Sequence, residues 1–181
     1  MDTPMSDFKF RAMSFFFKMR DLVAPPDHIL AEVDVRPGDR VLDYGCGPGA
    51  YIPALAERVG AAGRVYALDI HPLATQTVQK MAAQKGLDNV ETFCSSCQTG
   101  LPDHSIDVVL LYDIIHMLSE PGEVLAELHR ILKKDGMLSV TIHHIDHEQG
   151  IARITEQALF HLAQQGIETY TFVPNGKLAN L

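Results

Sequence analysis

Two patterns of apolar residues alternate along the chain, and their order predicts the strands and helices. Short, nearly continuous apolar runs are typical of strands buried in a parallel sheet. Between them lie longer segments whose apolar residues recur every three or four positions, as in amphipathic helices. The predicted strands are residues 40–44, 64–69, 89–94, 106–112, 137–143 and 167–173. The predicted helices are residues 8–22, 27–34, 51–59, 72–85, 121–132 and 149–165.

The alternation of strands and helices predicts an α/β fold. Crossover helices between parallel strands give a Rossmann-like, doubly wound, mostly parallel sheet with helices on both faces. The turn sequence 174–176, Pro-Asn-Gly, predicts a final hairpin into a short strand at residues 177–181. With 181 residues and no linker-like segment, the chain is expected to form a single domain, residues 1–181. Ligands of such sheets bind beyond the carboxyl ends of the strands.

Composition narrows the class of partner and the compartment. The formal charge is −8, and no run of Lys and Arg offsets it, so nucleic acid is not an expected partner. The three cysteines, Cys46, Cys94 and Cys97, suggest reduced thiols, and the Cys94–Cys97 pair lacks the second pair that a zinc site needs. We find neither a secretory leader nor an apolar run of the ~20 residues that would span a bilayer. A cytoplasmic protein without a membrane span is therefore expected.

A glycine-rich turn follows the first predicted strand and opens the next helix. Gly45, Gly47 and Gly49 let the backbone turn sharply and approach a ligand, while the amides of the following helix point towards that ligand. Asp43 lies just before the turn, and Asp69 ends the next strand. A carboxylate at the end of that second strand is placed to bind the ribose hydroxyls of a nucleotide.

Two cofactor classes compete for this turn. Gly45, Gly47 and Ala50 satisfy the G-x-G-x-x-G/A pattern of dinucleotide sites, so the spacing by itself does not decide. Asp43 discriminates between them, because a carboxylate at the mouth of the turn repels a pyrophosphate. It attracts the ammonium and sulfonium groups of S-adenosylmethionine (SAM). The residues therefore favour SAM over NAD.

Four segments in order resemble the motifs of class I SAM-dependent methyltransferases. Residues 41–49 read VLDYGCGPG and resemble the first motif, and residues 65–70, VYALDI, resemble the acidic second motif. Residues 101–109, LPDHSIDVV, and 130–138, RILKKDGML, resemble the segments that lead into the fourth and fifth strands. The resemblance covers about residues 35–173, and the nearest group is the methylases similar to quinone-biosynthesis C-methyltransferases.

The resemblance implies roles for individual residues. Asp43 and the glycine turn would hold the methionine end of SAM, Asp69 the ribose, and Ile70 the adenine ring. Ser96 and Cys97 stand where the family has an acidic residue and a small one at the adenine edge, so the adenine contact departs from the pattern. The implied cofactor-binding residues are Asp43, Tyr44, Gly45, Cys46, Gly47, Gly49, Asp69, Ile70, Ser96, Cys97 and Tyr112.

The two ends of the chain also carry expectations from the family. Its fold closes with an antiparallel hairpin whose last strand enters the sheet; here that strand is predicted at residues 177–181 and is short, so the hairpin is expected to be short or incomplete. The N-terminal region, residues 1–34, commonly forms a helical lid over cofactor and substrate. A helix simply packed on the sheet is the alternative for this region.

Histidines and aspartates follow the predicted strands 106–112 and 137–143. We expect His116, His143 or His144 to act on the methyl acceptor, with Asp113 or Asp146 orienting the imidazole. The alternatives are that these side chains only pack, or that a divalent metal binds among them, although no strict motif such as H-E-x-x-H is present and no metal is expected. The residues open to a metal are Asp113, His116, His143, His144 and His147.

The sequence thus predicts an enzyme that transfers a methyl group from SAM to a small molecule. The Asn/Asp-Pro-Pro-aromatic motif of enzymes that methylate nucleic-acid amino groups is absent after residue 112, and the acidic charge agrees with a small acceptor. A SAM-binding protein without catalysis is the first alternative, and a NAD(P)-dependent oxidoreductase the second. The acceptor and the oligomeric state do not follow from the sequence.

Overall fold

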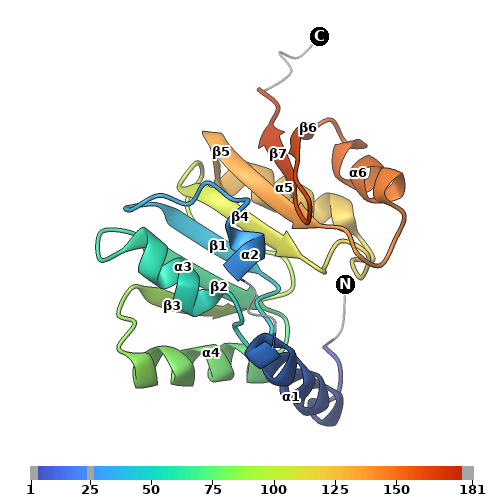
Figure 1. Ribbon diagram of the computed structural model, residues 1–181. Helices are drawn as coiled ribbons and strands as arrows, with labels where there is room; N and C mark the ends of the chain where they lie inside the picture. Colours follow the sequence, from blue (N-terminus) through green and yellow to red (C-terminus); the bar gives the residue numbers. More distant parts are fainter. Residues whose placement is uncertain (1–3, 24–26, 177–181) are drawn as a thin grey trace.

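One sheet organises the domain in a computed structural model that describes residues 4–23 and 27–176. Within these residues the strand order is β3-β2-β1-β4-β5-β7-β6 (Figure 1). Strands β1 to β5 are parallel, whereas β7 runs antiparallel between β5 and β6. The strands are β1 Arg40–Tyr44, β2 Arg64–Asp69, β3 Val90–Cys94, β4 Ile106–Tyr112, β5 Leu132–Thr141, β6 Phe160–Gln165 and β7 Tyr170–Pro174.

Helices cover both faces of this sheet. The helices are α1 Asp7–Val23, α2 Asp27–Leu30, α3 Ile52–Val59, α4 Pro72–Lys85, α5 Pro121–Ile131 and α6 His147–Thr155. Residues from α2, α3 and α4 share one buried cluster with β1, β2 and β4, and residues from α5 and α6 share a second cluster with the opposite face. Among the described residues, none of these helices has the length and apolar character needed to cross a bilayer.

The central strands are buried on both faces, which explains their continuous apolar sequences. In β1, Val41 contributes to the core under α3 while its neighbour Leu42 contributes to the core under α5. In β4, Val108 and Val109 divide in the same way, because successive side chains of a strand point to opposite faces. The predicted α/β class and doubly wound sheet are confirmed.

The sheet ends in an antiparallel hairpin, as predicted; β7 overlaps the predicted strand 167–173, but its hairpin partner β6 comes before it in the sequence. The predicted helix 149–165 is wrong beyond Thr155, since Phe160–Gln165 forms β6 and pairs with β7. Phe160 is buried and Leu162 half-buried, while His161 between them is exposed, as expected for a strand. In so short a segment this alternation does not distinguish a strand from the end of a helix. The predicted strand 177–181 lies outside the described residues.

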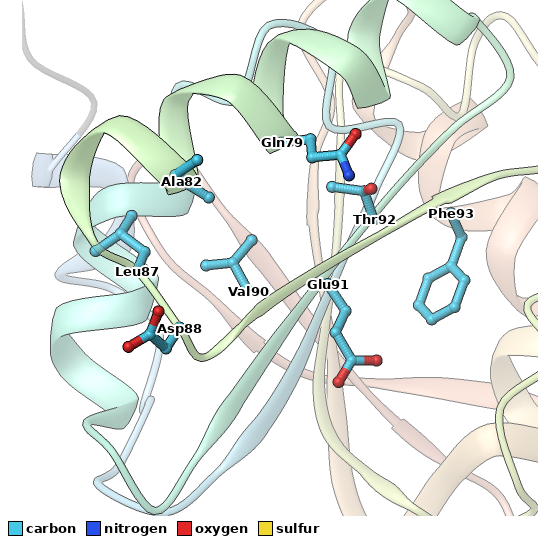
Figure 2. A pocket seen from close by; sticks show the side chains of 9 residues that line it. Gln79, Ala82, Leu87, Asp88, Val90, Glu91, Thr92 and Phe93 are labelled. Atoms are coloured by element: carbon cyan, nitrogen blue, oxygen red, sulfur yellow. The ribbon is translucent and has the colours of Figure 1, made fainter.

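A groove of about 470 Å³ runs between α4 and the edge strand β3 (Figure 2). Its walls include Ala82 and Leu87 from the helix side and Val90, Glu91 and Phe93 from the strand. None of the predicted cofactor or acceptor residues lines this groove. The predicted residues lie instead at and just after the carboxyl ends of β1 to β5.

Candidate functional site

The glycine turn between β1 and α3 is held tightly against the neighbouring strand. The amides of Gly45 and Cys46 both donate to the carbonyl oxygen of Leu68, at 2.7 and 3.0 Å. Gly45 has a φ of 82°, and a Cβ there would lie 2.5 Å from Cδ1 of Ile114. Position 45 therefore requires glycine both for its left-handed backbone and for the close approach of the loop after β4.

Asp43 is a buried carboxylate close beneath this turn. Its residue surface is 2% exposed, and its Oδ2 atom is buried without a hydrogen-bond partner among the described residues. Burial, and secondly the charge of Asp69, raises the pKa of Asp43 to about 7. An unpaired buried charge is costly, and a cationic ligand group beside it would offset that cost.

Asp69 joins the end of β2 to the glycine turn. Its Oδ1 accepts from the His71 amide at 2.7 Å, and its Oδ2 accepts from the Gly47 amide at 2.9 Å. Burial raises the pKa of Asp69 even though these two hydrogen bonds oppose the rise. Each carboxylate oxygen can accept a further hydrogen bond, so Asp69 remains able to take sugar hydroxyls beside the turn.

The segment after β3 packs against the end of β2. The Ser95 amide donates to the Asp69 carbonyl at 3.1 Å, and the Tyr44 hydroxyl donates to the Ser96 carbonyl at 3.0 Å. Tyr44 is buried, and its hydroxyl anchors this loop. The Cys97 amide already donates weakly to the Ser95 hydroxyl at 3.4 Å. The structure thus brings half-buried Ser96 and Cys97 beside the β2 end that carries Asp69.

Tyr112 ends β4 and lies near Tyr51 and Asp43. Its hydroxyl shares a 2.9 Å hydrogen bond with the Ser139 hydroxyl, and its ring meets Tyr51 edge to face at 5.1 Å between centroids. Burial first, and nearby charges including those of Asp43 and Glu32, raise the pKa of the phenol. The Tyr112 phenol is therefore neutral, and Tyr51 is a neighbour to which no sequence motif pointed.

Asp113 and His143 meet where β4 and β5 end. The Asp113 backbone is left-handed, with a φ of 55°, and its amide donates to the Thr141 hydroxyl at 2.9 Å. Its Oδ1 is 2.8 Å from Nδ1 of His143, and Nε2 of the same ring is 3.2 Å from Oε2 of Glu168. Two carboxylates thus hold the His143 imidazole at both nitrogens.

His116 and His144 form a second pair in the same region. Their ring centroids are 4.6 Å apart. Burial, and secondly the neighbouring His144, lowers the pKa of His116. His116 is accordingly neutral near pH 7 and has a nitrogen able to accept a proton.

Two of the predicted acceptor-side residues have structural partners instead. Asp146 caps α6 by accepting from the Glu148 and Gln149 amides, at 2.9 and 3.2 Å. His147 is hydrogen-bonded to the Tyr170 hydroxyl. Residue 143 precedes α6, so His143 and His147 do not share a helical face. Across the part of the chain that the structure describes, no three acidic, histidine or cysteine side chains are grouped so that they could hold a metal ion.

Glu32, which carried no signal in the sequence, ties the N-terminal segment to the β6–β7 turn. Its Oε2 accepts from the Thr169 amide at 2.9 Å and the Thr169 hydroxyl at 2.8 Å, and its carboxylate also accepts from the Glu168 amide at 3.1 Å. These bonds lower the pKa of Glu32 although desolvation works against them. The turn so fixed is the one whose Glu168 side chain reaches His143.

Replacing Gly166 with Ala is expected to destabilise the domain by about 1–3 kcal/mol. A Cβ at position 166 would lie 2.2 Å from Oε2 of Glu32. Gly176 has no atom within 4 Å of the corresponding position, so Gly176→Ala is the matched control. Urea unfolding of both variants and of Gly166→Ala combined with Glu32→Ala measures the effect. Equal stability of the two glycine variants, or a double variant in which the two costs simply add, would contradict the steric explanation.

The N-terminal helix contacts the site through Phe10. The Phe10 ring stacks on His71 with 4.4 Å between centroids and 26° between planes. His71 is 3% exposed, its Nδ1 accepts from the Leu73 amide, and its Nε2 lies 3.7 Å from Oδ1 of Asp7. Helix α1 is therefore seated directly beside the end of β2 that carries Asp69.

Comparison with known proteins agrees with this arrangement. The profile of a methyltransferase-domain family matches residues 36–177. The chain belongs to this family. The methyltransferase domain thus includes every predicted cofactor and acceptor residue and leaves α1 and α2 outside the matched region.

Relatives of the methyltransferase domain are known by name. Aklanonic acid methyltransferase DauC from Streptomyces sp. (strain C5) is 37% identical over 106 residues, which are 58% of this chain and 48% of that protein. Demethylmenaquinone methyltransferase from Geobacillus kaustophilus (strain HTA426) is 32% identical over 112 residues, 61% of this chain and 48% of that protein. The chain spans about half the length of these curated relatives.

Solved structures share the fold over nearly the whole chain. A SAM-dependent methyltransferase from Aquifex aeolicus superposes with a TM-score of 0.79 at 26% identity, covering 94% of this chain and 98% of that one. A second structure, from Methanococcus maripaludis, has a TM-score of 0.78 at 14% identity, covers 98% of this chain and 99% of that one, and shows the fold alone. The resemblance to class I SAM-dependent methyltransferases is confirmed.

Proposed function

We propose that this domain transfers the methyl group of SAM to a small-molecule acceptor. The observation that carries the proposal is the buried Asp43 carboxylate, which lies at the glycine turn with one oxygen unpaired. The names of the relatives support it, since aklanonic acid, demethylmenaquinone and nocamycin methyltransferases are named for small molecules. A pyrophosphate-containing cofactor would instead meet this carboxylate as a repelling charge.

The residues present fit SAM. Asp43 would lie beside the cationic methionine portion, and Gly45, Gly47 and Gly49 would allow the close approach of the backbone. Asp69 would accept from the ribose hydroxyls with the lone pairs that Gly47 and His71 leave free. When bound, SAM supplies a methyl group on a positively charged sulfur that is displaced in line by the acceptor. The protein positions the two reactants, excludes water from them and supplies a favourable electrostatic environment.

On the acceptor side, the proposal assigns different tasks to the two histidine pairs. His116, whose pKa is lowered, is the candidate general base, with His144 beside it. His143, with Asp113 and Glu168 at its two nitrogens, is the candidate orienting group for the acceptor.

The N-terminal segment, residues 1–34, is proposed as a lid, because α1 is seated on His71 next to Asp69. The three free thiols fit a cytoplasmic location.

Calorimetric titration of the protein with SAM and with NAD tests the cofactor assignment. SAM is expected to bind and NAD is not. Because the cation pairs with ionised Asp43, protonation of this group competes with binding, so affinity falls as pH drops through the pKa of about 7. The dissociation constant should rise about fivefold from pH 7 to pH 6 and little between pH 8 and pH 9. Binding of NAD in preference to SAM would overturn the assignment.

Transfer itself needs a separate measurement. Protein incubated with methyl-labelled SAM and a metabolite extract should pass label to a compound that mass spectrometry can identify. Tight SAM binding without transfer to any acceptor would favour the alternative of a SAM-binding protein without catalysis.

A further inference from the structure

Helix α1 presents two opposite apolar sides, of which one contacts the domain. Phe10 is 3% exposed and stacks on His71. On the other side lie large apolar side chains that solvent reaches. Their exposed fractions are 82% for Phe8, 63% for Phe15, 69% for Phe16 and 49% for Met19, and Met5, just before the helix, is 39% exposed.

These exposed residues form one stripe along the helix. Relative to Phe8, the other exposed apolar residues within α1 (Phe15, Phe16 and Met19) fall at positions +7, +8 and +11, which share one face at 3.6 residues per turn. Phe10 is two positions from Phe8, about 200° around the axis, and therefore lies on the opposite side. The stripe consequently faces away from His71 and from the cofactor end of the sheet, and α1 projects from the edge of the domain (Figure 1).

Basic residues lie on both margins of the stripe. At about 100° per residue, Lys9 falls on one margin and Arg11 on the other. Lys9 and Arg11 are exposed. Helix α1 thus carries four basic and two acidic residues in a chain whose net charge is −8. An apolar stripe flanked on both sides by exposed Lys or Arg side chains is the pattern of helices that lie in a membrane interface.

We propose that α1 docks the domain on an anionic phospholipid surface, with the stripe among the acyl chains and the basic margins at the headgroups. A second copy of the chain fits less well. Pairing two stripes face to face would bring the basic margins of one helix against those of its partner. A large exposed apolar patch without a partner marks an interaction site, and the charge on its margins selects a negative surface.

Cosedimentation of the full chain with vesicles tests the proposal without reference to catalysis. Vesicles of phosphatidylcholine with about one third phosphatidylglycerol should bind the protein, and vesicles of pure phosphatidylcholine should bind it much less. Phe15→Ser combined with Phe16→Ser should reduce binding at least about tenfold. Lys9→Gln combined with Arg11→Gln should reduce it by about tenfold or more and lessen its dependence on salt.

A matched control removes exposed apolar side chains elsewhere. Met117 is 56% exposed and Ile167 94% exposed, so Met117→Ser combined with Ile167→Ser should leave vesicle binding unchanged. Thermal unfolding of each variant checks that the domain stays folded. Absence of binding to anionic vesicles, or equal loss in the control and the phenylalanine variant, overturns the proposal. So does a concentration-dependent dimer in light scattering that the phenylalanine substitutions dissolve, since the stripe would then bind a second copy.

Discussion

Replacing Asp43 with Asn is expected to weaken SAM binding strongly and, at the same time, to stabilise the cofactor-free domain. The amide has nearly the same shape but no charge, so it cannot pair with the cationic methionine portion. Removing one partner of a buried charge pair weakens binding by about 100-fold or more. In the absence of the ligand, the same substitution removes an ionised group that is buried with an unpaired oxygen.

The stability gain has a defined pH dependence. Burial raises the pKa of Asp43 from 3.8 to about 7 in the folded domain, so the folded state binds a proton that the unfolded chain has released. The destabilising effect of Asp43 is therefore small below pH 4, grows as pH rises, and is complete above pH 7. The full effect corresponds to about 4 kcal/mol as an upper estimate.

Urea unfolding without cofactor at pH 5 and pH 8 measures this prediction. Asp43→Asn should gain about 2.5 kcal/mol more at pH 8 than at pH 5 relative to the native sequence. Asp88 is exposed, so Asp88→Asn serves as the control and should change stability little at either pH. An Asp43→Asn variant that loses stability at pH 8, or that binds SAM normally, would show that the carboxylate is not held ready for a cation. Function and stability are thus opposed at this residue.

The central sheet was predictable because its strands are buried on both faces. The bounds predicted for β1, β2 and β4 agree with the structure. Strands that are buried on both faces have nearly continuous apolar sequences, which are recognised without knowledge of their neighbours. The glycine turn was equally predictable, because its glycines are needed for the left-handed backbone of the turn itself. These features depend on residues that are close in sequence, and pattern reasoning detects them.

Features that depend on distant residues were not predictable. Segment 160–165 was assigned to a helix because its strand character comes from pairing with β7, which the local period does not reveal. Glu32 gave no signal, since its partners Glu168 and Thr169 lie more than 130 residues away in the sequence. His147 resembled its histidine neighbours until the structure paired it with Tyr170. The positions of the histidines and aspartates after two predicted strands located the acceptor side. Only the three-dimensional contacts distinguish the side chains that cap or pack from those that remain candidates for chemistry.

Replacing His116 with Ala is expected to lower turnover by about 100-fold or more while leaving SAM affinity nearly unchanged. Burial and the neighbouring His144 lower the pKa of His116 below 6.5, so the neutral ring needed in a base is present near pH 7 and is lost as pH falls through that lowered pKa. The turnover of the native sequence should therefore fall on the acid side of pH 6.5.

The variant series separates a base from a packing role. His116→Ala should abolish the acidic fall in turnover, and added imidazole should restore part of the rate, which a purely structural loss would not permit. His143→Ala should instead raise the KM of the acceptor and leave that pH profile in place, because His143 is held between Asp113 and Glu168. His161, exposed on β6, gives the control His161→Ala, with turnover unchanged. If His116→Ala retained full turnover and the same pH profile, the proton would have to leave the acceptor by another route, and the lowered pKa of His116 would reflect its packing against His144 alone.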